Sequence, residues 1–207
     1  MKAAIITNNE LKEELLAQGL QDSIQVEWLT EPSAADGADC YIDLLFEKKK
    51  SRIDALKKLE PAVIIVNEAA AANGEIPDSF IRVNAWPTFL KRQLVEASFI
   101  DDSGIAIAES VFAGFGKKTT WVPPGPGFIS ARVVSMIINE AYLALEENVS
   151  SKEEIDTAMK WGTNYPFGPF EWGRKIGLKN IYQLLDVMAQ ANDRYQPAAL
   201  LKIEAFT

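Results

Sequence analysis

The sequence predicts an α/β domain with a parallel sheet, followed by an all-helical domain. Between residues 2 and 68, short apolar runs alternate with amphipathic helical patterns, an order typical of doubly wound α/β folds. From residue 121 onward, apolar residues recur at spacings of three and four, as they do on one face of a helix. We therefore expect an α/β domain over residues 1–120 and a helical domain over residues 121–207.

The elements of the N-terminal half follow from these patterns. Strands are expected at 2–7, 25–30, 38–45 and 62–68, and helices at 11–20 and 51–59. The run at 62–68 is continuously apolar, which is typical of a parallel strand that is buried on both faces.

The composition restricts the function before any motif is considered. The 207 residues carry a net charge of −8, which disfavours nucleic acid as a partner. No apolar run is long enough for a membrane span, and the chain starts with an expected strand instead of a secretion signal. The single cysteine, Cys40, cannot form an internal disulfide, which is typical of a reducing compartment. We expect a cytoplasmic protein that binds neither membrane nor nucleic acid.

The chain contains no histidine. Because histidine is the only side chain with an unperturbed pKa near neutrality, acid–base chemistry here requires a carboxylate, a lysine, a tyrosine or the thiol. Histidine-ligated zinc is excluded as well, and a single cysteine cannot build a thiolate site. We expect no metal.

The turn after the first strand is the place where a dinucleotide-binding domain carries three spaced glycines. In this chain the turn reads TNNELK, and Thr7, Asn9 and Lys12 stand at the glycine positions. Their side chains would crowd a pyrophosphate, and Glu10 would add a negative charge beside it. The turn therefore predicts the loss of ordinary NAD binding. The alternative is that Asn8 and Asn9, which tolerate left-handed dihedrals, still shape a binding turn.

Glu31 is a further candidate for cofactor binding, beside Thr7 and Asn9. It follows the second strand at about the place where an acidic residue would hold a ribose. An acidic residue after a strand is also common on an ordinary surface, so both interpretations stay open.

The stretch 121–173 carries the clearest helical pattern. One apolar stripe, of the kind that normally faces a core, consists of Phe128, Ile129, Val133, Met136, Ile137 and Ala141. Ser151 and Glu154 form a capping-box pattern that starts a second helix, and Gly162 is expected to end it in a left-handed conformation. Further helices are expected at 180–188 and 197–205.

Twelve residues of this stretch also form a pattern with characteristic spacing. They are Gly127, Phe128, Arg132, Asn139, Glu140, Ala141, Ile155, Asp156, Gly162, Pro166, Gly168 and Pro169. With these residues, the stretch resembles the C-terminal helical domain of the 3-hydroxyacyl-CoA dehydrogenase family. The resemblance implies a Rossmann-like domain before it, here shortened, and a homodimer that packs through the helical domain. It also implies that Asn139 belongs to an active site.

The resemblance continues in the N-terminal half. Residues 38–69 are similar to the family's strand–helix–strand unit. The family has several dozen more residues before this unit, including a helical pair that grips acyl-CoA, where this chain has only residues 19–37. Acyl-CoA is the ligand that the resemblance implies, and the basic residues Lys49 and Lys50 are candidate contacts for its phosphates. The alternative is that this basic run is a solvated helix start.

The family's active site consists of a histidine base, a glutamate twelve residues later that orients it, a serine and an asparagine. Residues 82–98 align with the segment that carries the base. Asn84 stands at the histidine position, twelve residues before Glu96, and Ala69 stands at the serine position. An asparagine can form hydrogen bonds with a hydroxyl group but cannot usefully take up its proton. Glu96, Asn139 and Asn84 are therefore the candidate catalytic residues.

Two functional hypotheses follow. The first is a 3-hydroxyacyl-CoA dehydrogenase-like oxidoreductase of fatty-acid metabolism, with NAD as its cofactor by resemblance, an impaired or altered activity, and Glu96 as its base. The second is a non-catalytic dimeric relative, a pseudoenzyme. It would bind a ligand or a protein partner through the cleft that forms the family's active site, or through the dimer surface. The missing glycine turn, histidine and serine favour the second hypothesis on physical grounds.

Overall fold

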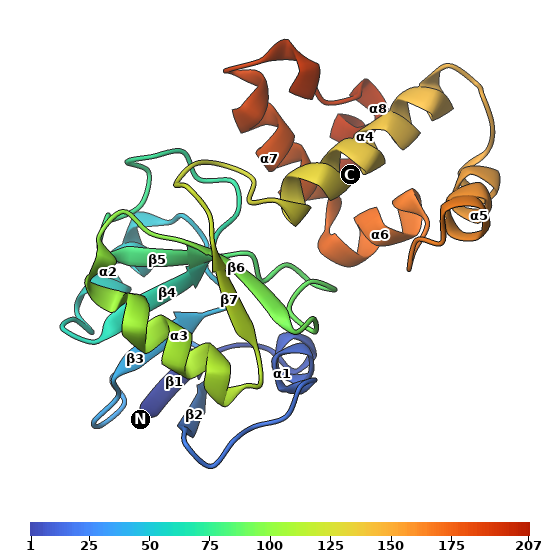
Figure 1. Cartoon of the computed structure of the whole chain (residues 1–207). Coiled ribbons are helices and arrows are strands. Elements are labelled where there is room, and N and C mark those ends of the chain that lie inside the picture. Colours follow the sequence, from blue (N-terminus) through green and yellow to red (C-terminus); the bar gives the residue numbers. More distant parts are fainter. The chain divides into compact units, whose positions relative to one another are not determined.

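The computed structural model describes residues 1–207, which divide into two compact units, Met1–Phe128 and Ile129–Thr207 (Figure 1). The first unit is α/β and the second is all-helical, so the fold class that the sequence predicts is confirmed. Each unit is described by itself. The domain limits expected from the sequence, 1–120 and 121–207, stay a prediction.

The α/β unit contains one sheet of seven strands. The strands are β1 (Lys2–Ile6), β2 (Gln25–Leu29), β3 (Cys40–Asp43), β4 (Val63–Asn67), β5 (Phe80–Val83), β6 (Leu94–Ser98) and β7 (Lys118–Trp121). The helices are α1 (Asn9–Leu16), α2 (Lys50–Lys57), the 3₁₀ helix η1 (Asp102–Gly104) and α3 (Ile105–Gly114). The strands and helices that the sequence predicts before residue 70 are all present, with slightly different bounds.

The strand order in the sheet is β2-β1-β3-β4-β5-β6-β7. Strands β1 to β5 are parallel, whereas β6 runs antiparallel to β5, and β7 runs parallel to β6. After β1 the chain turns to one side, to β2, and then crosses to the other side, to β3. In doubly wound sheets such a reversal opens a crevice at the carboxyl ends of the strands, where ligands bind. The carboxyl ends of β1 and β3 are therefore the expected location of a ligand site.

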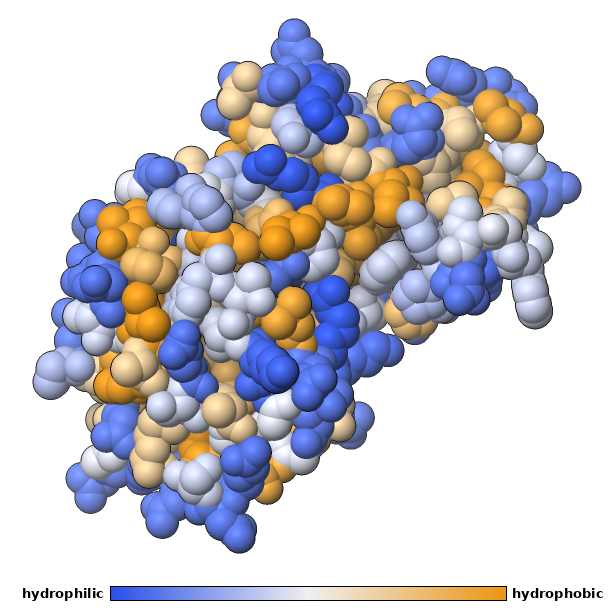
Figure 2. Space-filling model, viewed as in Figure 1, coloured by the Kyte–Doolittle hydropathy of each residue, from blue (hydrophilic) through white to orange (hydrophobic).

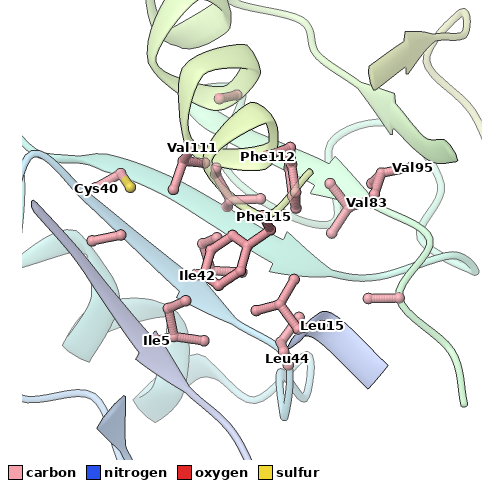
Figure 3. Close-up of a cluster of buried hydrophobic side chains, with 14 of the residues drawn as sticks. Ile5, Leu15, Cys40, Ile42, Leu44, Val83, Val95, Val111, Phe112 and Phe115 are labelled. Carbon is pink, nitrogen blue, oxygen red and sulfur yellow. The ribbon is translucent and has the colours of Figure 1, made fainter. Parts of the chain in front are cut away.

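Alternate residues of the central strands pack on opposite faces of the sheet. On one face the strands pack against α1 and α3 in a cluster that includes Ile5, Leu15, Cys40, Ile42, Leu44, Val83, Val95, Val111, Phe112 and Phe115 (Figure 3). On the other face, Leu56 of α2 packs with Ile6 and Val66. Burial of β4 on both faces agrees with its continuous apolar run.

The sequence pattern does not reveal β5 and β6, because each strand contains a buried charged residue. Arg82 in β5 and Glu96 in β6 are only 6% and 5% exposed. The Arg82 guanidinium donates hydrogen bonds to the carbonyls of Glu68 (3.1 Å) and Gly125 (3.0 Å), which compensate for part of its lost hydration. A charge in the middle of a short strand interrupts the apolar pattern from which strands are predicted.

The helical unit contains five α-helices and a 3₁₀ helix. They are α4 (Ser130–Glu146), α5 (Lys152–Thr163), α6 (Pro169–Ile176), α7 (Leu178–Ala189), η2 (Asp193–Tyr195) and α8 (Ala199–Ala205). The helices expected at 180–188 and 197–205 correspond to α7 and α8. None of the helices in either unit combines the length and the apolar character needed to cross a membrane.

The start of α5 agrees with the sequence, but its end does not. The Ser151 hydroxyl accepts a hydrogen bond from the Glu154 amide (3.3 Å), and the Glu154 carboxylate accepts one from the Ser151 amide (3.3 Å), which completes the capping box. The expected stop at Gly162 is wrong, because the left-handed residue is Asn164, with φ 55° and ψ 35°. Asparagine adopts this conformation more readily than other residues with a side chain, so it can end a helix as glycine does.

The turn before α6 is held by Asp156 of α5. Its carboxylate accepts hydrogen bonds from the amides of Phe170 (2.8 Å) and Glu171 (3.0 Å), which have no partner inside α6. The negative charge also complements the helix N-terminus. A Cβ atom on Gly168 would lie 2.3 Å from the Asp156 carboxyl carbon, so this position requires glycine. Packing therefore accounts for Asp156 and Gly168, two positions of the family pattern.

Helix α4 has two apolar faces. One face is buried against α6, α7 and α8, and it consists of Ala131, Val134, Ser135, Ile138, Asn139, Ala141 and Tyr142. The other face carries most of the stripe that the sequence assigns to a core. Ile129 and Val133 are 56% and 53% exposed, and Met136 and Ile137 are half-buried. That expectation holds for Phe128 and Ala141 but is wrong for the four residues between them, since the neighbouring helices cover only one side of α4.

Replacing Ser151 by alanine removes half of the capping box. We expect the first turn of α5 to lose about 1 kcal/mol of local stability, so hydrogen exchange of its amides should become about fivefold faster. Mass spectrometry on the full chain measures this exchange. Thr157→Ala is the matched control, because Thr157 lies on the same helix and its hydroxyl donates only to the Glu153 carbonyl (2.7 Å). Equal acceleration in both variants would contradict the assignment.

Candidate active site at the carboxyl edge of the sheet

Asn84 and Glu96, two of the three predicted catalytic residues, form a buried hydrogen-bonded pair. Asn84 follows β5, and Glu96 lies in the neighbouring strand β6. The Asn84 amide donates to the Glu96 carbonyl (3.0 Å), and Asn84 Nδ2 donates to Glu96 Oε2 (3.1 Å). Their exposed fractions are 2% and 5%. The structure thus joins the two positions that the resemblance assigns to the base and to the carboxylate that orients it.

The chemistry of this pair differs from that of a histidine and a carboxylate. An amide nitrogen has no lone pair available for a proton, so Asn84 offers hydrogen bonds only. Glu96 is the one member of the pair that can take up a proton, and one of its oxygens already accepts a hydrogen bond from Asn84. Ala69, at the predicted serine position, is buried and adds no hydroxyl.

Asn67 joins the carboxyl ends of three strands beside this pair. Its Nδ2 donates to the carbonyls of Leu44 (3.1 Å) and Ala85 (3.2 Å), and its Oδ1 accepts from the Ala85 amide (3.0 Å). Since Ala85 directly follows Asn84, these bonds fix the backbone that positions the pair.

The loop between β5 and β6 is held by two charged residues that the sequence analysis misses. Glu14 of α1 accepts a hydrogen bond from the amide of Thr88 (2.6 Å), whose φ of 77° is rare for a residue with a side chain. Lys117, which is 3% exposed, donates to the carbonyl of Leu90 (2.6 Å). Burial lowers the pKa of Lys117 to about 8. A glutamate on a helix and a lysine before an edge strand give no recognisable signal in a sequence.

The turn after β1 is occupied by its own hydrogen bonds. The Thr7 hydroxyl donates to the Asn8 carbonyl (3.1 Å), and the Asn8 side chain caps α1 by accepting from the Leu11 amide (2.9 Å). Asn8 is extended (φ −100°, ψ 177°), and Asn9 is the first helical residue, so the alternative of a left-handed asparagine turn is wrong. A pyrophosphate binds to free backbone amides at the start of a helix. In α1 the Leu11 amide already donates to Asn8, and Glu10 places a negative charge in the same turn.

Glu31, the predicted ribose contact, is bound by Arg52 of α2. Arg52 Nη1 donates to Glu31 Oε2 (3.0 Å), while Nε and Nη2 donate to the two carboxylate oxygens of Asp43 (2.7 and 2.8 Å). Asp43 ends β3, is completely buried, and also accepts from the Leu45 amide (3.0 Å). Because β1 lies between β2 and β3, the guanidinium bridges the crevice across the end of β1.

Two opposing effects act on the Asp43 carboxyl. Burial raises its pKa, and the hydrogen bonds and charge of Arg52 lower it, with burial the larger effect. The same pair raises the pKa of Arg52. Since a guanidinium stays protonated in proteins and its fork matches a carboxylate, we take the pair as ionised. The sequence analysis misses Asp43, whose only signal is an acidic residue in an otherwise apolar strand.

The basic run before α2 is largely paired with acidic neighbours. Lys48 contacts Glu75 (2.7 Å), and Lys49 contacts Glu47 (2.5 Å). Lys49 and Lys50 are exposed, and α2 begins at Lys50 without a side-chain cap. Their role as phosphate contacts stays a prediction.

Asn139, the third predicted catalytic residue, belongs to the other unit, on the buried face of α4. Its Oδ1 accepts from the Ala198 amide (2.8 Å), and its Nδ2 donates to the Gln196 carbonyl (3.0 Å). The residue is 2% exposed. Both polar atoms of the amide are thus bonded to the segment before α8, which gives Asn139 a structural role in its own unit.

A groove of about 530 Å³ lies in the helical unit, and Asn139 is not among the residues that line it. It is lined by Arg132, Val133, Met136, Ile137, Glu140, Ala141, Ala144, Ile155, Met159, Pro169, Arg194 and Tyr195. Figure 2 shows hydrophobic surface along the line of α4. The groove coincides with the open face of α4, and therefore with most of the stripe found in the sequence.

The sheet with its crevice, followed by a separate helical unit, defines a Rossmann-like protein with a helical C-terminal domain. Within this class the comparisons identify the family. Residues 127–203 match the family described as 3-hydroxyacyl-CoA dehydrogenase, C-terminal domain. The chain belongs to the 3-hydroxyacyl-CoA dehydrogenase family, as the resemblance indicates.

Similar proteins of known sequence extend this result to the α/β unit. A 3-hydroxyadipyl-CoA dehydrogenase of Escherichia coli K12 is 42% identical over 92 residues, which cover 44% of this chain and 19% of that protein. A 3-hydroxybutyryl-CoA dehydrogenase of Bradyrhizobium diazoefficiens is 30% identical over 186 residues, which cover 80% of this chain and 63% of that protein. The chain thus spans less than two thirds of the length of either relative.

Solved structures agree on the fold. The (S)-3-hydroxybutyryl-CoA dehydrogenase of Ralstonia eutropha superimposes with a TM-score of 0.74 at 21% identity, covering 98% of this chain and 92% of that chain. FadB2 of Mycobacterium tuberculosis gives a TM-score of 0.76 at 16% identity, covering 99% and 93%. At these identities the similarity concerns the fold alone.

Replacing Arg52 by methionine leaves the Asp43 carboxylate buried without its cation. We expect a loss of about 3–5 kcal/mol in the free energy of unfolding of the α/β unit. With the cation removed, only the Leu45 amide bond still opposes burial, and burial, the larger effect, favours the protonated carboxyl in the folded state. The folded state then binds more protons than the unfolded state, so the loss should be larger at pH 8 than at pH 5. Urea denaturation at both pH values measures this.

The control is Glu31→Gln, which alters only the exposed contact between Arg52 and residue 31. Its side chain is 76% exposed, so we expect a change within about 0.5 kcal/mol at either pH. A similar loss in the free energy of unfolding in both variants would contradict the view that the buried bonds between Arg52 and Asp43 provide the stability.

Proposed function

We propose that this protein is a relative of the 3-hydroxyacyl-CoA dehydrogenases in acyl-CoA metabolism that keeps their fold but not their ordinary NAD-dependent hydride transfer. The observation that carries the proposal is the buried pair of Asn84 and Glu96. Removal of a hydride from a 3-hydroxyl group needs a base that takes the hydroxyl proton as the hydride leaves. In this chain an amide stands at the position of the base, and no histidine occurs elsewhere in the sequence to replace it.

The cofactor implied by the family is NAD, and the residues at the crevice do not fit it well. A dinucleotide needs free amides at the start of α1 and an acidic residue for its ribose. The Leu11 amide is bonded to Asn8, and Glu31 is bonded to Arg52, whose side chain is 14% exposed. A dinucleotide at this place would have to displace the capping bond and the ion pair. We therefore assign no chemical step to NAD in this protein.

The ligand proposed instead is an acyl-CoA, or a protein that binds this family's fold. Relatives named for 3-hydroxyadipyl-CoA and 3-hydroxybutyryl-CoA support the acyl-CoA. We expect its phosphates to contact Lys49 and Lys50, which are exposed. The cytoplasm is proposed as the location. The single cysteine, Cys40, is free, which supports a reducing compartment.

Titration with NADH tests the cofactor part of the proposal. We expect no saturable change in NADH fluorescence at micromolar concentrations, because the groups that would bind the dinucleotide are already bonded. A parallel calorimetric titration with acetoacetyl-CoA tests whether the protein binds an acyl-CoA. Acyl-CoA binding without NADH binding is the expected combination, whereas micromolar NADH binding would overturn the statement that the turn after β1 has lost the cofactor.

An assay of acetoacetyl-CoA reduction by NADH tests the missing base. We expect no turnover by the wild-type protein. The competing hypothesis, in which Glu96 is the base, predicts turnover that falls at least about 100-fold in Glu96→Gln, because glutamine keeps the hydrogen bond with Asn84 but takes no proton. Glu109→Gln is the matched control, since Glu109 lies at the surface and bonds Trp121 (2.8 Å). Wild-type turnover with that dependence on Glu96 would refute our proposal.

A further inference from the structure

Arg82 of β5 and Ser98 of β6 are buried polar residues outside the candidate active site, with exposed fractions of 6% and 1%. They are paired across the two antiparallel strands. Paired residues point to the same face of a sheet, with their Cβ atoms about 5 Å apart. Both residues line a small pocket, and neither Asn84 nor Glu96 lines it. The pocket is therefore separate from the buried pair described above.

The size and walls of this pocket restrict what it can hold. Its volume of about 10 Å³ is enough for one particle of the size of a water molecule. A nucleotide, a phosphate group or an acyl chain does not fit. No carboxylate lines the pocket, and its apolar walls include the side chains of Ile76, Phe80, Phe99 and Ile100.

The guanidinium of Arg82 has donors that the chain does not use. Its Nε and Nη2 atoms bond the carbonyls of Glu68 and Gly125, and Arg82 forms no ion pair within the chain. A guanidinium has more N–H groups than these two bonds use. Burial lowers the pKa of Arg82, since the charge has lost most of its hydration. A buried cation of this kind is stabilised by an anion in direct contact.

Two carboxylates act on Arg82 from a greater distance, and both are bonded to other groups. Glu68 accepts a hydrogen bond from the Ala70 amide (2.7 Å), and Glu75 forms an ion pair with Lys48 (2.7 Å). The chain itself therefore provides no anion in contact with the guanidinium.

Ser98 adds a second unused group to the same pocket. Its Oγ atom is buried and has no hydrogen-bond partner within the chain, an arrangement that destabilises a fold. A hydroxyl can donate to the same acceptor as a guanidinium. An anion accepts from both groups, whereas a water molecule would also need acceptors for its own two hydrogens, and Arg82 offers none.

We propose that Arg82 and Ser98 bind a monatomic anion of the size of chloride in this pocket. The ion accepts a charge-assisted hydrogen bond from the guanidinium and a second bond from the hydroxyl. Since the same guanidinium holds the Gly125 carbonyl, the ion also stabilises the segment that follows β7. The proposal does not depend on whether the protein binds NAD or an acyl-CoA.

Thermal unfolding of the full chain in two salts of equal ionic strength tests the proposal. Sodium chloride supplies an ion that fits the pocket, and sodium gluconate supplies an anion that is too large for it. We expect the unfolding midpoint to be about 2 °C higher in chloride, because a ligand that binds only the folded state stabilises it. Differential scanning calorimetry measures the midpoint.

Ser98→Ala removes one of the two donors. In chloride, this variant should lose at least about half of the shift, whereas in gluconate it should be as stable as the wild type or more stable, because an unpaired hydroxyl is gone. Thr119→Val is the matched control. It also removes a buried hydroxyl without a partner, but Thr119 does not line the pocket, so the full shift should remain.

Crystals grown in sodium bromide locate the ion directly. We expect an anomalous scattering peak between the Arg82 guanidinium and Ser98 Oγ. A wild-type protein with equal midpoints in the two salts would overturn the proposal and leave the pocket to water. A shift that Ser98→Ala retains in full, or bromide peaks only at other places, would overturn it as well, because the ion would then bind elsewhere.

Discussion

The ion pair between Arg52 and Asp43 is the interaction on which the carboxyl edge of the sheet depends. A carboxylate at the end of a central strand loses its hydration completely, and only a bidentate cation with a further amide bond compensates for this. The pair ties α2 to β3 at the point where the strand order reverses. Through its third bond Arg52 also engages Glu31, the acidic residue that follows β2. The interaction that stabilises this edge therefore occupies the crevice in which doubly wound proteins bind their ligands.

Asn84 and Glu96 stand at the two positions that the resemblance assigns to a base and to the carboxylate that orients it, and in this chain they form a buried hydrogen-bonded pair. Asn67 holds the backbone after Asn84, and Glu14 and Lys117 hold the loop that follows. The hydrogen bond between the two side chains is buried, as a bond between a base and the carboxylate that orients it would be. The side-chain amide of Asn84 donates a hydrogen bond to the buried carboxylate but cannot take up a proton.

In the helical unit, packing accounts for much of what resembles a functional motif. Asp156 caps α6, and Gly168 leaves the space for it. Asn139 holds the segment before α8 with both of its polar atoms. Packing within the unit does not account for the second apolar face of α4. Packing against α6, α7 and α8 covers the first face, whereas a groove runs along the second.

Four features could be predicted from the sequence: the order of the elements before residue 70, the all-helical second half, the capping box at Ser151 and the family. These features depend on periodicity and on residues close together in the chain, where the physical rules are local. It also placed Asn84 twelve residues before Glu96. Three features could not be predicted and required the folded structure: the hydrogen bond between these two side chains, the bonds of Arg52 to Asp43 and Glu31, and the outward orientation of the stripe on α4. Each of these depends on which residues distant in sequence become neighbours, and a pattern along one chain does not contain that information.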